Sequence, residues 1–378
     1  MLLIFPFMAK EFNLNLTEVS ILRSVFNVTA IVFTMPTLFI INKFSNKKIL
    51  LISDLVAALS FAALGFAQGF FMIIVFRILW SISMTLLSPI PKSEVAKLAP
   101  VGKMGEIIGN IGSVGEIGRA MISTICGYLI IWLGWQSSTI WIGSSIAVIV
   151  VAIMYFTRKE KYVDQHISGA RIDVKKMLKN RVLNWAYICS MMDNFASSII
   201  PFFLPFLILF YNYDVWYLPV VNVILLIGAV VGRSALGGLA DKHRPGIVFA
   251  ISEVLMGFMA LILGLSNNIV LILLAVFGIG LVTKGTLPIT SLMIINSTQK
   301  DGSNKSAFTV DMFLVNITGM ISATLFGMLG DVTNVSVIFI GIFITSLFAA
   351  VCGLVYNRIV KNQDSLNPND ELLTETNN

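Results

Sequence analysis

The feature that most limits what this chain can fold into is a series of long apolar runs. A helix needs about 20 mostly apolar residues to cross the hydrocarbon layer of a membrane. Such runs recur along the whole chain and are separated by short polar segments. We read eleven of them, at 17–41, 49–68, 70–91, 105–133, 136–157, 183–210, 216–239, 246–266, 269–295, 305–329 and 334–357.

Composition supports the same interpretation. Apolar residues make up 57% of the 378 residues and charged residues only 12%, whereas soluble domains have about 45–50% and about 25%. A soluble protein has too little interior to hide this apolar excess. We therefore predict an all-α integral membrane protein.

Residue types that carry catalysis or bind metals are sparse. Cys126, Cys189 and Cys352 each lie inside an apolar run, and an odd number argues against a disulfide framework. His166 and His243 stand alone in polar segments, so no zinc cluster is expected. There is no nucleophile motif and no phosphate-binding loop. We predict that the chain is not an enzyme and uses no cofactor.

The positions of the basic residues predict the orientation. If the segment after Ile41 is cytoplasmic, cytoplasmic segments carry 20 of the 26 Lys and Arg residues, and only Lys10 falls in an outer loop. This is the positive-inside pattern. It predicts a plasma-membrane protein whose central segment and C-terminus are cytoplasmic. The net charge of +6 is then a topology signal, and no nucleic-acid partner is expected.

The longest polar interruption divides the chain into two bundles. We predict an N-terminal bundle at 1–157, a cytoplasmic linker at 158–181, a C-terminal bundle at 182–360 and a disordered tail at 361–378. Met1–Met8 is apolar but too short to cross a membrane. We interpret it as the outer part of a first helix whose first half is absent from this chain, which gives eleven full spans and a half.

A charged turn follows the seventh of these complete runs and has a weaker copy half a chain earlier. The turn reads Gly-Gly-Leu-Ala-Asp-Lys-His-Arg-Pro at 237–245. The copy reads Asn-Lys-Phe-Ser-Asn-Lys-Lys at 42–48, also after the second span of its half. Gly134-Trp135-Gln136 stands in the expected outer loop before the run at 136–157.

These features resemble the major facilitator superfamily of secondary transporters, whose loop signature is Gly-x-Leu-Ala-Asp-Arg-x-Gly-Arg-Arg. The chain departs where Arg244 replaces the second glycine and Pro245 the next basic residue. The resemblance implies two six-helix halves, related by a pseudo-twofold axis, that rock about a central site. It also implies gating roles for residues of both loops: Asn42, Lys43, Gly237, Asp241, Lys242 and Arg244.

Polar residues inside the runs are the candidates for the transport site, because charges in a membrane usually face a partner or a cavity. Arg77 matches the arginine of the family's fourth-helix motif, which is implicated in proton coupling in antiporters; the alternative is that it ties helix ends together. Glu116 and Arg119 share a helix face, either as an internal ion pair or as ligands.

Further candidates lie in the second half. Asp193, Asn194, Lys284, Asp311 and Asn316 are expected to line the site, with Lys284 paired to either acid. Pro201 and Pro205 lie further along the Asp193 run, where prolines can break a helix. Arg233 and Glu253 flank the signature loop and are interpreted as gate or structural residues. Arg23 lies near the outer end of the first complete run and is expected to snorkel.

The predicted function is transport of a small solute by alternating access, with a small anionic or zwitterionic metabolite favoured and the proton as a candidate coupling ion. The antiporter motif of the fifth helix lacks its proline, because Ile122-Ser123 stands in its place. The alternatives are an efflux antiporter for lipophilic cations and a non-transporting sensor or assembly protein of the same fold. Expected partners are the solute and the lipid bilayer, and we expect a monomer.

Overall fold

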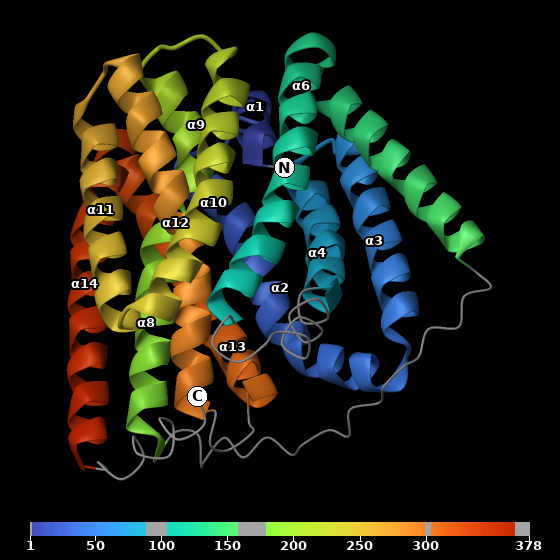
Figure 1. Cartoon of the computed structure of the whole chain (residues 1–378). Coiled ribbons are helices and arrows are strands. Elements are labelled where there is room, and N and C mark those ends of the chain that lie inside the picture. The colour runs from blue at the N-terminus through green and yellow to red at the C-terminus, as the bar shows by residue number, and fades with distance from the viewer. Residues whose placement is uncertain (1, 88–103, 158–178, 299–303, 367–378) are drawn as a thin grey trace.

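The computed structural model describes residues 2–87, 104–157, 179–298 and 304–366, and every regular element in these ranges is helical (Figure 1). The N-terminal half contains η1 (Leu2–Ile4), α1 (Phe5–Glu11), α2 (Leu16–Lys43), α3 (Asn46–Ala63), η2 (Leu64–Phe66), α4 (Phe70–Leu87) and α6 (Met104–Phe156). The C-terminal half contains α8 (Arg181–Ser197), α9 (Ile200–Phe210), α10 (Tyr217–Lys242), α11 (Pro245–Leu265), α12 (Ile269–Thr298), α13 (Asn304–Val332) and α14 (Val335–Leu366).

The predicted membrane spans are confirmed. In the described ranges ten helical segments are long and apolar enough to cross a membrane, and one of them, Gly112–Phe156, is 45 residues long. This segment holds two of the predicted spans and bends at Gly134, whose φ is +78°. The connection predicted at Gly134-Trp135 takes the form of a tight turn, because α6 rises to the upper end in Figure 1, reverses there and runs back down. Gly134 allows this turn, since glycine adopts a positive φ without steric cost.

The predicted span at 183–210 is interrupted. α8 ends at Ser197, and α9 begins at Ile200 with Pro201 in its first turn. A proline in the first turn loses no intrahelical hydrogen bond, which makes a new helix start favourable there. Pro205 and Pro288 lie inside α9 and α12, and neither ends its helix.

The two predicted polar segments can be assessed only in part. Of the linker predicted at 158–181, residues 158–178 lie outside the described ranges, and α8 begins at Arg181 after an Asn180 cap. The tail predicted from 361 begins too early, because α14 continues to Leu366. Polar residues do not by themselves end a helix, and neither glycine nor proline occurs in this stretch until Pro368.

The two halves meet along two helix pairs, which we call seams. α2 packs against α13, and α6 packs against α10. Within the halves, α3 packs against α4 and α6, α10 against α12, and α11 against α14. At the upper end in Figure 1, α1 fills the space between the halves, and the ring of Phe5 lies edge-on to Phe202, with centroids 5.1 Å apart.

The pair α10 and α12 is held at close range by glycines. A Cβ atom at Gly232 would lie 1.8 Å from the carbonyl oxygen of Leu281, and one at Gly280 would lie 2.1 Å from that of Leu225. In lipid, small residues allow helix backbones to approach closely and gain van der Waals contact. This crossing is therefore a rigid element of the C-terminal half.

Gly232→Ala should destabilise the protein, because the new methyl group has no space against the α12 backbone. Overpacking of this kind costs about 1–3 kcal/mol. Gly238→Ala is the matched control on the same helix, since no atom lies within 4 Å of its added Cβ. Thermal unfolding of the detergent-purified variants measures the difference. Equal transition temperatures for the two variants would contradict the crossing as described.

Candidate functional site

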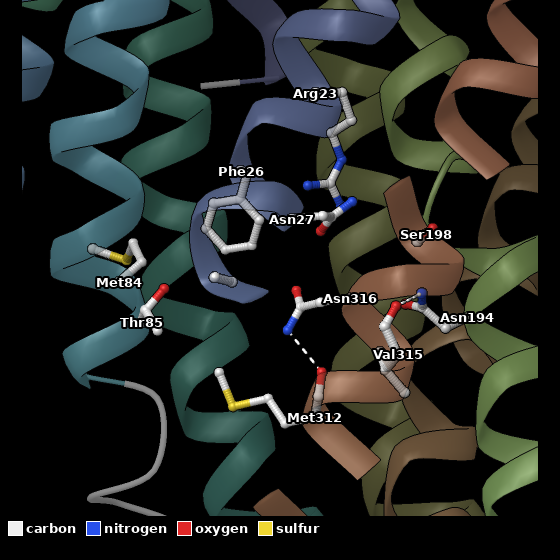
Figure 2. Close-up of a pocket in the computed structure, with 11 residues that line it drawn as sticks. Arg23, Phe26, Asn27, Met84, Thr85, Asn194, Ser198, Met312, Val315 and Asn316 are labelled. Atoms are coloured by element: carbon white, nitrogen blue, oxygen red, sulfur yellow. Dashed lines mark hydrogen bonds between the residues drawn. The ribbon is translucent and has the colours of Figure 1, made fainter. Parts of the chain in front are cut away.

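A cavity of about 220 Å³ lies between the two halves (Figure 2). Its lining comes from α2 and α4 on one side and from the α8 segment and α13 on the other. The lining residues are Arg23, Phe26, Asn27, Ala30, Met84, Thr85, Asn194, Ser198, Met312, Val315 and Asn316. A space walled by both halves can change shape whenever the halves move relative to each other.

Arg23 is the one charged side chain among these lining residues, all of which the structure describes. Its guanidinium carbon lies 5.6 Å from the centroid of the Phe26 ring. The expectation that Arg23 snorkels at the outer end is wrong. Arg23 lies about 10 Å into α2, at 1.5 Å per residue from Leu16, and its side chain faces the cavity (Figure 2).

Three asparagine amides lie at the cavity wall. Asn194 Nδ2 donates to the carbonyl oxygen of Val315 at 2.9 Å, and Asn316 Nδ2 donates to that of Met312 at 2.7 Å. Asn27 Nδ2 is buried and has no acceptor among the described residues. Buried polar groups are nearly always hydrogen-bonded, so Asn27 can donate to a bound solute.

A glycine lets the amides of the two halves come together. A Cβ atom at Gly319 of α13 would lie 2.9 Å from Asn27 Nδ2 and 3.1 Å from Asn194 Nδ2. The structure thus brings Asn194 and Asn316 to one cavity, together with Asn27. The spacing of Asn27 is a signal for its place at the site, since it follows Arg23 by four residues and so shares its helix face. Thr85 and Ser198 carry no comparable signal.

The ion pair predicted between Glu116 and Arg119 forms and includes a third member. Glu116 is 1% exposed; its Oε1 lies 3.0 Å from Arg119 Nη1 and 3.1 Å from Arg233 Nη2. Arg233 belongs to α10, so the pair crosses the α6–α10 seam. Gly112 allows this, because a Cβ atom there would lie 2.1 Å from Arg233 Nη1. None of these three ionic residues lines the cavity.

The same seam carries further hydrogen bonds. The Ser113 hydroxyl donates to the carbonyl oxygen of Val230 at 2.9 Å and lies 3.1 Å from the hydroxyl of Ser234. Nearer the upper end, Asn222 Nδ2 donates to Ser123 Oγ at 2.7 Å. The α6–α10 contact therefore carries polar interactions at several positions along the two helices.

The α2–α13 seam is polar at its upper end. The Asp331 carboxylate accepts hydrogen bonds from the backbone N–H groups of Leu16 and Thr17, both at 2.9 Å, and from the Thr17 hydroxyl at 2.5 Å. A carboxylate is favourable at a helix N-terminus, where N–H groups lack partners. Deeper along the seam, the hydroxyls of Ser24 and Thr324 lie 3.2 Å apart.

Arg77 lies away from the cavity lining. It is 3% exposed and its Nε donates to the carbonyl oxygen of Leu22 at 3.4 Å. Its guanidinium carbon lies 5.4 Å from the centroid of the Phe5 ring and 5.0 Å from that of Trp80. These contacts join α4 to α1 and α2, which supports the structural interpretation of this arginine.

The other charged candidates in the C-terminal half are not among the residues that line the cavity. Asp193 Oδ1 accepts a hydrogen bond from the Thr286 hydroxyl at 3.0 Å. Lys284 takes part in neither of the two ion pairs recorded in the described ranges, so the pairing predicted with Asp193 or Asp311 is not seen. Asp311 precedes the lining residue Met312 and is half-buried.

The signature loop is shorter than predicted. Asp241 and Lys242 form the last turn of α10, and only His243 and Arg244 separate it from α11. Gly237 is buried inside α10. The gating role of this loop stays a prediction.

The earlier copy of the loop is also short. Asn42 and Lys43 end α2, and their side chains lie outside the described part of the chain. Lys47, at the start of α3, donates through Nζ to the carbonyl oxygen of Thr157, just after α6. The lower ends of α3 and α6 are therefore tied together within the N-terminal half.

Arg233→Gln should destabilise the protein more than Arg119→Gln. Removing one partner of a buried ion pair typically costs about 3–5 kcal/mol, because the remaining charge is left uncompensated. Arg233 is 15% exposed and spans the seam, whereas Arg119 is 66% exposed. Thermal unfolding in detergent compares them. An Arg119→Gln variant as unstable as Arg233→Gln would contradict this ranking.

Comparison with known proteins agrees with this architecture. The model of the Major Facilitator Superfamily matches residues 1–301. A comparison with curated proteins finds no match. The helical bundle, the two seams and the cavity between the halves accord with the family match. The chain is an integral membrane protein and belongs to the major facilitator superfamily, a family of transporters.

Proposed function

We propose that this protein is a secondary transporter that carries a small anionic or zwitterionic solute through the cavity between its halves. The observation that carries the proposal is the charge of the lining. Among the described residues that line the cavity, Arg23 is positive and none is acidic. Guanidinium binds carboxylate or phosphate through paired hydrogen bonds, so a solute with such a group is favoured.

The size of the cavity supports a small solute. Its volume is about 220 Å³, whereas pockets for drug-sized ligands are about 300–1,000 Å³. A lipophilic cation would also meet the like charge of Arg23. Both considerations favour a metabolite over the lipophilic cations that efflux antiporters carry.

The neutral polar groups suit a solute with more than one polar end. Asn27 offers an unused donor, and the Thr85 hydroxyl retains acceptor capacity while it donates to the carbonyl oxygen of Ser81 at 2.8 Å. Asn316 and Ser198 lie on the opposite wall (Figure 2). A zwitterion could place its anionic group at Arg23 and its cationic group near these oxygens.

The seams supply the moving parts of the mechanism. When the halves rock, contacts such as Asp331 with the N-terminus of α2 would open on one side of the membrane while others close. We also propose that the protein acts as a monomer in the plasma membrane, with the lower end of the bundle on the cytoplasmic side, as the positive-inside pattern favours. Arg23 would then be reached from either side in turn.

The proposal predicts stabilisation by anionic solutes that depends on Arg23. A ligand that binds only the folded state adds about 2.7 kcal/mol of stability at a hundred times its dissociation constant. The screen measures thermal unfolding of purified protein with carboxylates, phosphate esters, amino acids and lipophilic cations. Arg23→Gln should weaken binding by about 2 kcal/mol or more, and Arg23→Lys by less.

The matched control is Arg181→Gln, which removes an exposed arginine at the start of α8 and should leave binding unchanged. Stabilisation by lipophilic cations alone would overturn the proposed solute class and favour drug efflux. If no solute both stabilises the protein and crosses liposome membranes with it, a non-transporting sensor or assembly protein becomes the better account.

A further inference from the structure

Two acidic side chains meet inside the C-terminal half, apart from the cavity lining. Glu253 of α11 is 0% exposed and Asp193 of α8 is 3% exposed. Their carboxyl groups lie within hydrogen-bonding reach of each other. Glu253 lies about 12 Å along α11 from Pro245, at 1.5 Å per residue, inside a membrane span. Glu253 is therefore fully buried beside Asp193, and its predicted role as a gate or structural residue stays a prediction.

The two carboxyl groups differ in the hydrogen bonds that they receive. Asp193 Oδ1 accepts a hydrogen bond from the Thr286 hydroxyl at 3.0 Å. Neither carboxylate oxygen of Glu253 receives a hydrogen bond from a donor in the described part of the chain. Glu253 is thus a buried acceptor that lies beside a second carboxyl group.

Other titratable groups face the pair from the surrounding helices. They are Lys284 of α12, Cys352 of α14 and Cys189 of α8. Lys284 is absent from the ion pairs recorded in the described ranges, which both belong to Glu116. No direct ion pair there neutralises either carboxylate.

An ionised carboxylate can only accept hydrogen bonds, whereas a protonated carboxyl group also donates one. Two ionised carboxylates in contact inside a membrane repel each other and lack water. One proton removes both problems, because the protonated group donates to its neighbour. We propose that Asp193 and Glu253 form a binding site for one proton, which the two carboxyl groups share.

The proton site lies next to a residue that lines the cavity, which suggests a role for the proton in transport. Asn194, the next residue along α8, lines the cavity, so one turn of α8 carries the proton site on one face and a solute contact on another. This step rests on the proposed function: the shared proton would be the coupling ion for an anionic solute. Rotation of α8 during rocking would then change the surroundings of both sites together.

Infrared spectroscopy of purified protein tests the site without any transport assay. A protonated carboxyl group has a C=O stretch separate from the bands of ionised carboxylates and amides. At neutral pH the wild type should show this band, and Glu253→Gln should lose it, because the glutamine amide can donate to Asp193 directly. Asp193→Asn should remove the band or move its frequency. Asp214→Asn, which alters an exposed acid in the α9–α10 loop, is the control and should leave it unchanged.

If Glu253→Gln does not fold, Thr286→Val tests the same pair, because it removes the donor to Asp193 and keeps both carboxyl groups. It should change the frequency of the band. A spectrum without the band in the wild type, or the same band in the wild type and in all three site variants, would overturn the shared proton. These outcomes are independent of Arg23, so a failed solute screen and a failed proton site are distinguishable.

Discussion

Polar groups inside a hydrocarbon layer cannot bond to water, and every part of this bundle reflects that constraint. The lipid-facing helix surfaces are apolar, and many of the polar side chains gather where the two halves meet. Glu116 reaches Arg233 across one seam, and Asp331 holds the N-terminus of α2 across the other. The polar groups that join the halves are also the ones that can exchange partners. Stability and movement thus depend on the same contacts.

The interior of the C-terminal half, unlike the seams, is held by close packing of helix backbones. At the α10–α12 crossing, Gly232 and Gly280 allow backbone contact that leaves no space for an added methyl group. Packed interfaces of this kind shift between discrete arrangements rather than deforming continuously. We therefore expect each half to move as a body and the seams to change. The cavity at Arg23 lies on the boundary that such movement alters.

Much of the fold was predictable from the sequence, because the thickness of a membrane fixes the length of an apolar helix. The turn at Gly134 was predictable too, since a glycine between two apolar runs can adopt the positive φ that a tight turn needs. The place of Arg23 at the cavity was not predictable, because an arginine near a helix end can either reach the membrane surface or line a cavity. Which of the two occurs depends on the helices that pack around it, and the sequence does not specify these. The contact between Asp193 and Glu253 joins residues far apart in sequence. Composition and spacing cannot reveal such a contact, although each residue alone was a candidate.

If solute crosses through the cavity as the seams open and close, a reversible cross-link between the halves must stop transport. Ser24 and Thr324 have hydroxyls 3.2 Å apart across the α2–α13 seam, so cysteines there can meet disulfide geometry. The Ser24→Cys and Thr324→Cys pair would be placed in protein lacking Cys126, Cys189 and Cys352 and reconstituted in liposomes. Uptake of the solute found to stabilise the protein should stop on oxidation and return on reduction. Unchanged uptake with the disulfide formed would contradict movement at this seam.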